Sequence, residues 1–144
     1  MMRGRFRHSP ALIARDSRAA AIVEFALLAP VLLTILLGVL GYGQYFLLAH
    51  SAQQIANDSA RATISGMNAA ERFGLANAAM AKSLSRLPEI KPGTAAIAVE
   101  EAPPLVTVKV RIDAGAIGLF RIKLLPMPDP MIERSAVIQQ GGVL

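Results

Sequence analysis

The longest pattern in the chain is an apolar run over residues 25–49, and no Asp, Glu, Lys or Arg occurs within residues 25–57. An α-helix rises about 1.5 Å per residue, so about 20 residues cross the hydrocarbon core of a bilayer. A cleavable secretory signal has a shorter apolar segment of about 7–15 residues. The pattern therefore predicts a retained single-pass membrane anchor rather than a conventional signal peptide.

Three features stand out in this predicted span. Glu24 lies at its beginning, and an acidic residue there is a functional-site candidate because hydrocarbon is a costly place for an unpaired charge. Pro30 falls inside the run and predicts a local bend. Gly38, Gly41 and Gly43 form a small-residue patch that admits a neighbouring backbone. Ordinary glycine in a membrane helix explains the same three positions equally well.

Helical spacing continues beyond the run. Apolar and small residues recur there at alternating steps of four and three, at Leu48, Ala52, Ile55, Ser59 and Ala62. Ala52, Ala56 and Ala60 add an alanine-rich face that allows close packing. One long helix is therefore predicted over residues 21–65, half in lipid and half in water, and Gly66 ends it.

A second amphipathic helix is predicted over residues 69–87. Asn68 and Glu71 have the spacing of a capping box at its start, and Pro88 stops it. Its apolar stripe consists of Ala69, Phe73, Ala76, Met80, Leu84 and Leu87. Lys91-Pro92-Gly93 then predicts a turn.

After this turn, apolar and polar residues alternate with a period of two. The alternation starts at residues 97–99, and residues 101–104 predict a connection. The clearest strand has its apolar positions at Val106, Val108, Val110 and Ile112. A weaker strand, or a loop, is indicated by alternation at Phe120, Ile122 and Leu124. Residues 132–139 predict a last short strand, at a sheet edge or returning across the sheet.

These elements predict an α+β fold with a long N-terminal transmembrane helix, a second amphipathic helix and a small antiparallel β-sheet. The apolar face of the sheet needs a cover, which the second helix or the wet half of the first supplies. We expect a basic cytoplasmic arm over residues 1–20 and a transmembrane helix with an extracytoplasmic extension over residues 21–66. A small periplasmic α+β domain follows over residues 67–144.

Basic residues concentrate before the apolar run. The net charge is +5, and residues 1–24 contain five arginines against Asp16 and Glu24. Loops that stay in the cytoplasm are enriched in Lys and Arg. We therefore expect a cytoplasmic N-terminus, a helix in a bacterial inner membrane and a periplasmic chain after about Ser51. Topology explains the arginines without nucleic acid as a partner.

The sequence offers no catalytic constellation. The chain contains no Cys, so disulfide and thiolate chemistry are excluded. His8 and His50 fall on opposite sides of the predicted span, and no nucleophile elbow, phosphate loop or zinc spacing occurs. Glu100 and Glu101 are adjacent in the predicted turn, which favours a solvated corner over an acid/base pair. We therefore expect no enzyme activity, cofactor, bound metal or small-molecule substrate.

The start of the span resembles a known family. Residues 18–33 read Arg-Ala-Ala-Ala-Ile-Val-Glu-Phe-Ala-Leu-Leu-Ala-Pro-Val-Leu-Leu, and Gly38 and Tyr42-Gly43 follow. A basic residue, a short apolar stretch, Val-Glu-Phe-Ala-Leu, a proline and a leucine-rich run closed by glycine resemble the TadE-like family. These are pilin-like proteins of the tight-adherence (Flp) pilus machinery. The resemblance covers about residues 16–60 and leaves the predicted sheet uncovered.

The resemblance implies a role in assembling a surface fibre. Some members resemble prepilins, which a membrane peptidase cuts before the apolar helix, with glycine before the cut and glutamate fifth after it. Ala19 then takes the glycine position, Ala20 becomes the first residue and Glu24 is the glutamate. Ala19 departs from the pattern, which leaves processing open. In pilin-like assemblies such a glutamate neutralises the amino terminus of an adjacent subunit; the alternative is a Glu24 held at headgroup level by Arg15 and Arg18.

Two functions remain. The first is a minor pilin or pseudopilin-like component of a tight-adherence pilus or related secretion machinery, which meets other assembly proteins through its N-terminal helix. Its candidate packing positions are Glu24, Phe25, Pro30, Gly38, Gly41, Ala52, Ala56 and Ala60. The second is a single-pass membrane-anchored module whose periplasmic domain binds a partner unrelated to pili. A ligand-sized pocket would favour the second function.

Overall fold

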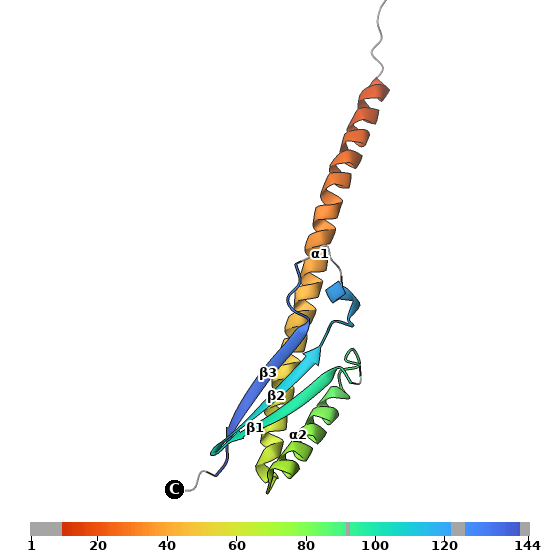
Figure 1. The fold of residues 1–144 in the computed structure, drawn as a ribbon. Helices are drawn as coiled ribbons and strands as arrows, with labels where there is room; N and C mark the ends of the chain where they lie inside the picture. Colours follow the sequence, from red (N-terminus) through yellow and green to blue (C-terminus); the bar gives the residue numbers. More distant parts are fainter. Residues whose placement is uncertain (1–9, 92, 122–125, 142–144) are drawn as a thin grey trace, which may run out of the picture. The chain divides into compact units, whose positions relative to one another are not determined.

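The computed structural model describes residues 10–91, 93–121 and 126–141. The chain divides into two compact units, Met1–Val39 and Leu40–Leu144. The elements (Figure 1) are α1 (Pro10–Ala62), η1 (Thr63–Ser65), α2 (Ala69–Leu84), β1 (Ala95–Ala102), β2 (Leu105–Asp113), η2 (Gly118–Arg121) and β3 (Met131–Gln139). A long apolar helix, a second helix and a three-stranded antiparallel sheet confirm the α+β prediction.

Helix α1 begins at Pro10, earlier than the predicted start near Ala21. Proline is favourable in the first turn of a helix because its fixed φ is helical and its missing N–H has no partner there. The residues that follow are mostly alanine, leucine, isoleucine and arginine, several of which are strong helix formers. Helix α1 ends at Ala62, and the 3₁₀ turn η1 carries the chain to Gly66, where the predicted end lies.

The sheet has the order β1-β2-β3, and both strand pairs are antiparallel. Pro103 and Pro104, joined by a cis peptide bond, form the short turn between β1 and β2. The register pairs Val108 with Val99 on one side and with Ala136 on the other. Strand β3 therefore lies at a sheet edge, which confirms that prediction.

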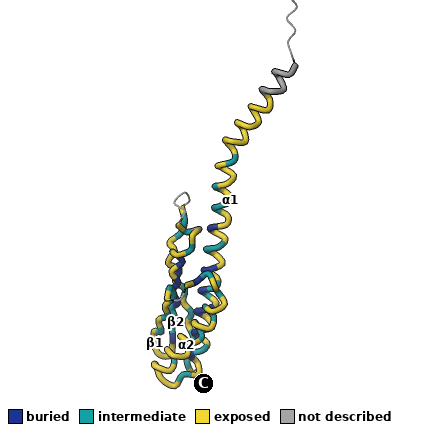
Figure 2. The backbone as a smooth tube through the Cα atoms, turned by 90° about the vertical axis from the view of Figure 1, so that its right-hand side faces the viewer, coloured by how far each residue is buried: buried dark blue, intermediate teal, exposed yellow. Residues whose placement is uncertain are grey.

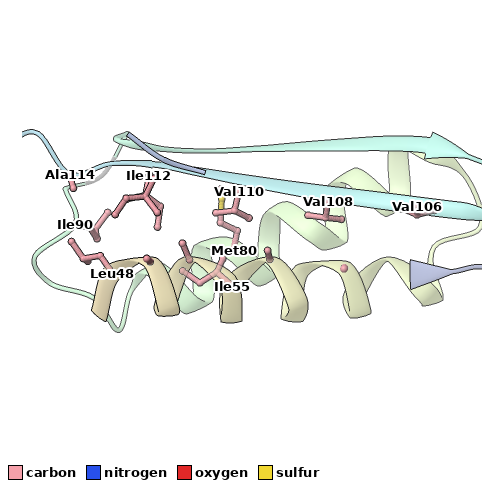
Figure 3. Packing of buried hydrophobic residues seen from close by; sticks show 14 residues of the cluster. Leu48, Ile55, Met80, Ile90, Val106, Val108, Val110, Ile112 and Ala114 are labelled. Carbon is pink, nitrogen blue, oxygen red and sulfur yellow. The ribbon is translucent and has the colours of Figure 1, made fainter. Parts of the chain in front are cut away.

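Both helices of the second unit cover one face of the sheet (Figure 2). The side chains of β2 that point to this face are Val106, Val108, Val110 and Ile112, and none is more than 2% exposed. Figure 3 shows Leu48 and Ile55 of α1 and Met80 of α2 packed beneath them. The sequence predicted that one helix or the other covers the sheet. In the structure both helices do so.

The extension of α1 packs through the predicted small face. Ala52, Ala56, Ser59 and Ala60 are each 0% exposed. Gln53 belongs to the same part of α1. Its side-chain amide donates a hydrogen bond of 3.0 Å to the carbonyl oxygen of Ser135 in β3. Small residues let a helix approach a sheet closely, so the alanine face is occupied by the domain's own core.

The start of α2 has the predicted Asn68 cap, but the Glu71 carboxylate reaches one residue further back than in a capping box. The Asn68 side-chain oxygen accepts a 2.9 Å hydrogen bond from the Glu71 backbone N–H, and the Glu71 carboxylate accepts one of 2.8 Å from the Met67 N–H. The helix ends at Leu84, and the remainder of the predicted segment turns at Leu87. Ala76 and Met80 of the predicted stripe are buried, whereas Phe73 is 46% exposed.

The predicted turn at residues 91–93 is present around its two described residues. The Thr94 N–H donates to the Lys91 carbonyl oxygen, and Gly93 has a φ of +87°. Glycine adopts such a backbone conformation without steric cost. Pro92 lies outside the described residues.

The sequence indicated either a weak strand or a loop around Phe120. The strand prediction is wrong for this residue. This residue lies in η2, where the Phe120 N–H donates to the Ile117 carbonyl oxygen and the Ile117 N–H donates to that of Ala114. Successive tight turns replace an extended strand, and three alternating apolar residues are too few to prevent this. Ile122 and Leu124 lie outside the described residues.

Glu100 and Glu101 were also placed wrongly, since both belong to β1 and not to a turn. Successive side chains of a strand point to opposite faces of the sheet. Glu100 accordingly pairs with Lys109 at 2.6 Å, and Glu101 pairs with Arg72 of α2 at 2.7 Å. The connection between the strands is shorter than predicted because β1 continues to Ala102.

Candidate functional site

The N-terminal part of α1 exposes apolar side chains around its circumference. Phe25 is 70% exposed, Leu32 is 64% and Leu36 is 52%. Within the described part of the chain, α1 is the one helix long and apolar enough to cross a membrane. Contact of so long an apolar surface with water is unfavourable. Helix α1 is therefore consistent with a single-pass membrane anchor.

Glu24 lies on the exposed surface of this helix. Ala20, its neighbour one turn earlier, and Ala19 are exposed as well. Of the residues whose side chains are described, none forms an ion pair or hydrogen bond with the Glu24 carboxylate. Among residues 17–39, whose side chains are described, the first unit therefore presents one acidic group, Glu24, and a long apolar surface, with the Ala19–Ala20 bond inside the helix.

Pro30 lies within α1, which continues through it. The Thr34 hydroxyl donates a 2.7 Å hydrogen bond to the Pro30 carbonyl oxygen one turn below. In the glycine patch, Gly38 is half-buried in the first unit and Gly43 is exposed in the second. Gly41, also in the second unit, is buried.

The apolar run meets the rest of the second unit at Tyr42 and Tyr45. The Tyr42 hydroxyl donates a hydrogen bond to the Pro126 carbonyl oxygen. The Tyr45 and Phe120 rings are in edge contact, with centroids 6.3 Å apart. The connection from β2 to β3 thus returns to α1 within the predicted membrane run. Sequence reasoning missed this contact, although two tyrosines near the end of an apolar run are a signal for a polar–apolar boundary.

Arg72 joins three parts of the second unit. Its guanidinium donates hydrogen bonds of 2.7 and 2.8 Å to the two carboxylate oxygens of Glu101, and one of 3.1 Å to the Gly66 carbonyl oxygen. These bonds hold the pKa of the Glu101 carboxyl below its ordinary value, and the carboxylate raises the pKa of Arg72. Bidentate geometry of this kind fixes orientation as well as distance.

Gly66 is required by this junction. A Cβ at this position would lie 2.5 Å from Arg72 Cγ and 2.9 Å from the Arg72 backbone nitrogen. Its φ of −80° is open to every residue type, so the need is for space and not for backbone freedom. The sequence predicted that Gly66 ends the helix. The structure shows that its lack of a side chain allows Arg72 to approach closely.

The described residues contain no cluster of three or more His, Cys, Asp or Glu that could hold a metal ion. His50 lies 3.1 Å from the Gln54 side-chain nitrogen, and His8 lies outside the described part of the chain. Glu100 and Glu101 engage different cations on opposite faces of the sheet.

The second unit has an apolar groove of about 530 Å³ between the end of α2 and the start of β1. Met80, Leu84 and Ile90 contribute apolar walls, and Lys91 lies at its edge. Ligand sites of this size combine apolar walls with several convergent polar groups. Ser85 and Lys91 are the groove's polar lining side chains, so its chemistry is sparse.

Comparison with known proteins gives a match over part of the first helix. No curated protein and no solved structure gives a significant match to this chain. The match that does occur covers most of α1 and leaves the sheet uncovered. Residues 19–61 match the model of the family described as TadE-like protein, which confirms the resemblance of this segment.

Proposed function

We propose that this chain is an inner-membrane-anchored structural component, of the minor pilin or pseudopilin kind, that assists assembly of a tight-adherence pilus or a related secretion machinery. The observation that carries the proposal is an exposed apolar helical segment with Glu24 directly before it, within the TadE-like match, and none of the described side chains pairs with the Glu24 carboxylate. The arginines before the span favour a cytoplasmic N-terminus and a periplasmic sheet domain.

Glu24 supplies the proposed specificity of assembly. A carboxylate near the hydrocarbon loses hydration, and an amino terminus or basic group of a neighbouring subunit repays this cost. Apolar contacts alone allow helices to slide along one another, whereas a single charge pair fixes one register. We therefore assign Glu24 the role of aligning this helix with its neighbour, and Phe25 and Pro30 the role of shaping the adjacent surface.

The assembly surface that we propose is limited to the exposed part of α1. Ala52, Ala56 and Ala60 are covered by the chain's own sheet domain, so their packing role is internal. Gly38 and the apolar residues before it remain accessible to a second helix. This division gives the two halves of α1 different partners, one intermolecular and one intramolecular.

Processing by a prepilin peptidase is a further part of the proposal. The bond between Ala19 and Ala20 has Glu24 at the expected distance, but alanine in place of glycine. This bond lies inside α1, so cleavage requires the peptidase to open the helix locally. N-terminal mass spectrometry of membrane-extracted protein, with and without the peptidase, decides between a chain that starts at Ala20 and an intact one.

The role of Glu24 is tested by pilus output at matched protein levels. Glu24→Gln removes the charge and keeps the shape, and Glu24→Ala removes both. Equal defects in the two variants, with an intermediate Glu24→Asp, are expected if the charge pairs with a neighbour. Asp58→Asn is the control, since it removes an exposed carboxylate from the same helix outside the apolar run. Normal output from Glu24→Ala would refute the assembly role.

The apolar groove supports a second candidate function, a membrane-anchored periplasmic binding module. Leu84→Arg fills and charges the groove, and this variant leaves the exposed part of α1 unchanged. Loss of function in Leu84→Arg together with normal function in Glu24→Ala would favour the binding module. The opposite pair of results would favour assembly through the helix.

A further inference from the structure

The chain segments that leave β2 and enter β3 both return to the same two turns of α1. Phe120 contacts Tyr45 through its ring edge, and the Pro126 carbonyl oxygen accepts the Tyr42 hydroxyl hydrogen bond. Figure 1 shows these segments beside α1, above the end of β2 and the start of β3. All of these residues belong to the second unit. We call Tyr42, Tyr45, Phe120, Arg121 and Pro126 the collar.

The same turns of α1 have another side, which is exposed. Leu40, Phe46 and Leu47 are 52%, 65% and 59% exposed. Leu48 and Ala49, which follow, are buried in the core of the domain. The collar therefore lies at the level where α1 changes from exposed apolar residues to residues packed under the sheet.

Helix length gives the depth of this level in a bilayer. Residues 25–44 are the first 20 of the apolar run and rise about 30 Å, which matches the hydrocarbon core. The apolar run extends five residues further, to residue 49. Tyr45 then falls at the headgroup layer and Tyr42 less than one turn before it, where tyrosine is enriched because its ring is apolar and its hydroxyl is polar.

The collar has the chemistry of an interfacial contact. Phe120 is half-buried against Tyr45, and Arg121 next to it is exposed. Of the described residues, none forms an ion pair with Arg121. A free guanidinium beside aromatic rings suits anionic headgroup phosphates, which accept bidentate hydrogen bonds.

We propose that the collar is a second membrane contact, in which Phe120 enters the headgroup layer and Arg121 binds anionic phospholipid. The inference rests on the proposed membrane anchoring of α1. Because the collar and α1 touch the bilayer together, they restrict rotation of the sheet domain about the helix axis. The domain then presents one defined side to its neighbours in the periplasm.

The chain contains no Trp and no Cys, so a single substitution introduces the only probe of each kind. Full-length Phe120→Trp is reconstituted in vesicles of phosphatidylcholine and phosphatidylglycerol that carry brominated acyl chains. Phe73→Trp is the matched control, because Phe73 lies at the start of α2, beyond the end of α1, and is exposed. Bromolipids are expected to quench Phe120→Trp at least twofold more strongly than Phe73→Trp.

The anionic lipid is tested by a second comparison. Quenching of Phe120→Trp should rise when phosphatidylglycerol replaces part of the phosphatidylcholine, and Arg121→Gln should abolish this rise. Arg61→Gln, at the far end of α1, should leave it unchanged. Equal quenching in both lipids, or an equal effect of the two glutamine variants, would overturn the assignment of Arg121.

Failure of the collar and failure of the anchor give different results. Vesicle flotation of the chain with unquenched Phe120→Trp would overturn the collar, leave the anchor intact and direct the search to a protein partner. Absence of flotation would overturn the anchor and the collar together. Met127→Cys, labelled with a polarity-sensitive dye, is the second probe if Phe120→Trp fails to fold, and a water-like emission from it would overturn the collar.

Discussion

Two stretches of one helix, α1, meet two different surroundings. Around residues 22–36 leucines and isoleucines point in every direction and are exposed, as at Leu36 with 52%. Around residues 48–60 apolar and small residues share one face and are buried, as at Leu48 with 0%. Hydrophobicity around the whole circumference of an exposed helix is thus consistent with lipid as its solvent, whereas one-sided hydrophobicity is typical of packing against a protein core.

The largest expected effect separates these stretches with the same substitution. Leu48→Ala leaves a cavity under the sheet and should lower the free energy of unfolding of the domain by about 2–5 kcal/mol. Leu36→Ala should change it by less than about 0.5 kcal/mol, since Leu36 is an exposed residue outside the core cluster. Urea unfolding of the full chain in detergent, followed by the circular dichroism of the sheet domain, measures both. Equal losses of unfolding free energy in Leu48→Ala and Leu36→Ala would show that the two stretches do not differ in their surroundings.

The next effect concerns insertion rather than folding. Leu36→Arg should cost about 2.5–3.5 kcal/mol on insertion scales and shift protein out of the carbonate-resistant membrane fraction. Gln54→Arg adds the same charge to the exposed side of the extension and should remain in that fraction. Retention of both variants at the level of the parent would contradict a membrane role for residues 25–44.

A smaller effect compares two glycines of the second unit. Gly66→Ala places a Cβ against the backbone of Arg72 and should destabilise the domain by about 1–3 kcal/mol. Gly74→Ala, in α2, meets no atom within 4 Å and should stabilise it by up to about 1 kcal/mol, because alanine is the better helix former. Opposite signs in thermal unfolding are the expected result.

The smallest effect is the pH dependence contributed by Glu101. Its pKa is lowered by Arg72, so its contribution is present above the ordinary carboxyl pKa and is lost as the pH falls through the lowered value. Glu101→Gln should therefore be less stable than the parent at pH 7, and the difference should shrink below about pH 4. Asp58→Asn is the control, and an unchanged difference at both pH values would rule out the pair as the cause.

Periodicity predicted most of the fold. The extension of α1, the capping of α2 and strands β2 and β3 were all recoverable from local patterns, because each depends on residues within a few positions of one another. The burial of Ala52, Ala56 and Ala60 followed from their spacing. Their spacing did not predict that they pack against the chain's own sheet.

The rest depends on contacts between distant residues. Arg72 and Glu101 are separated by 29 positions, and Tyr42 and Pro126 by 84. No local pattern encodes such pairs, and Glu101 was misplaced because Pro103 and Pro104 indicated a longer turn than the one that forms. The TadE-like motif pointed to the candidate residues around Glu24, and the intermolecular role that we propose for them involves a second subunit, which a single chain does not contain.

The most direct test of the proposed function is cross-linking from α1 in living cells. A photoactivatable amino acid replaces Phe25 in a chain with Glu24 and in one with Glu24→Gln; replacement of Asp58 is the control. We expect position 25 to cross-link to another pilus assembly protein, with a yield that falls severalfold in Glu24→Gln, and position 58 to give no such product. Equal cross-linking with and without Glu24, or adducts of position 25 with lipid alone, would contradict assembly through this helix.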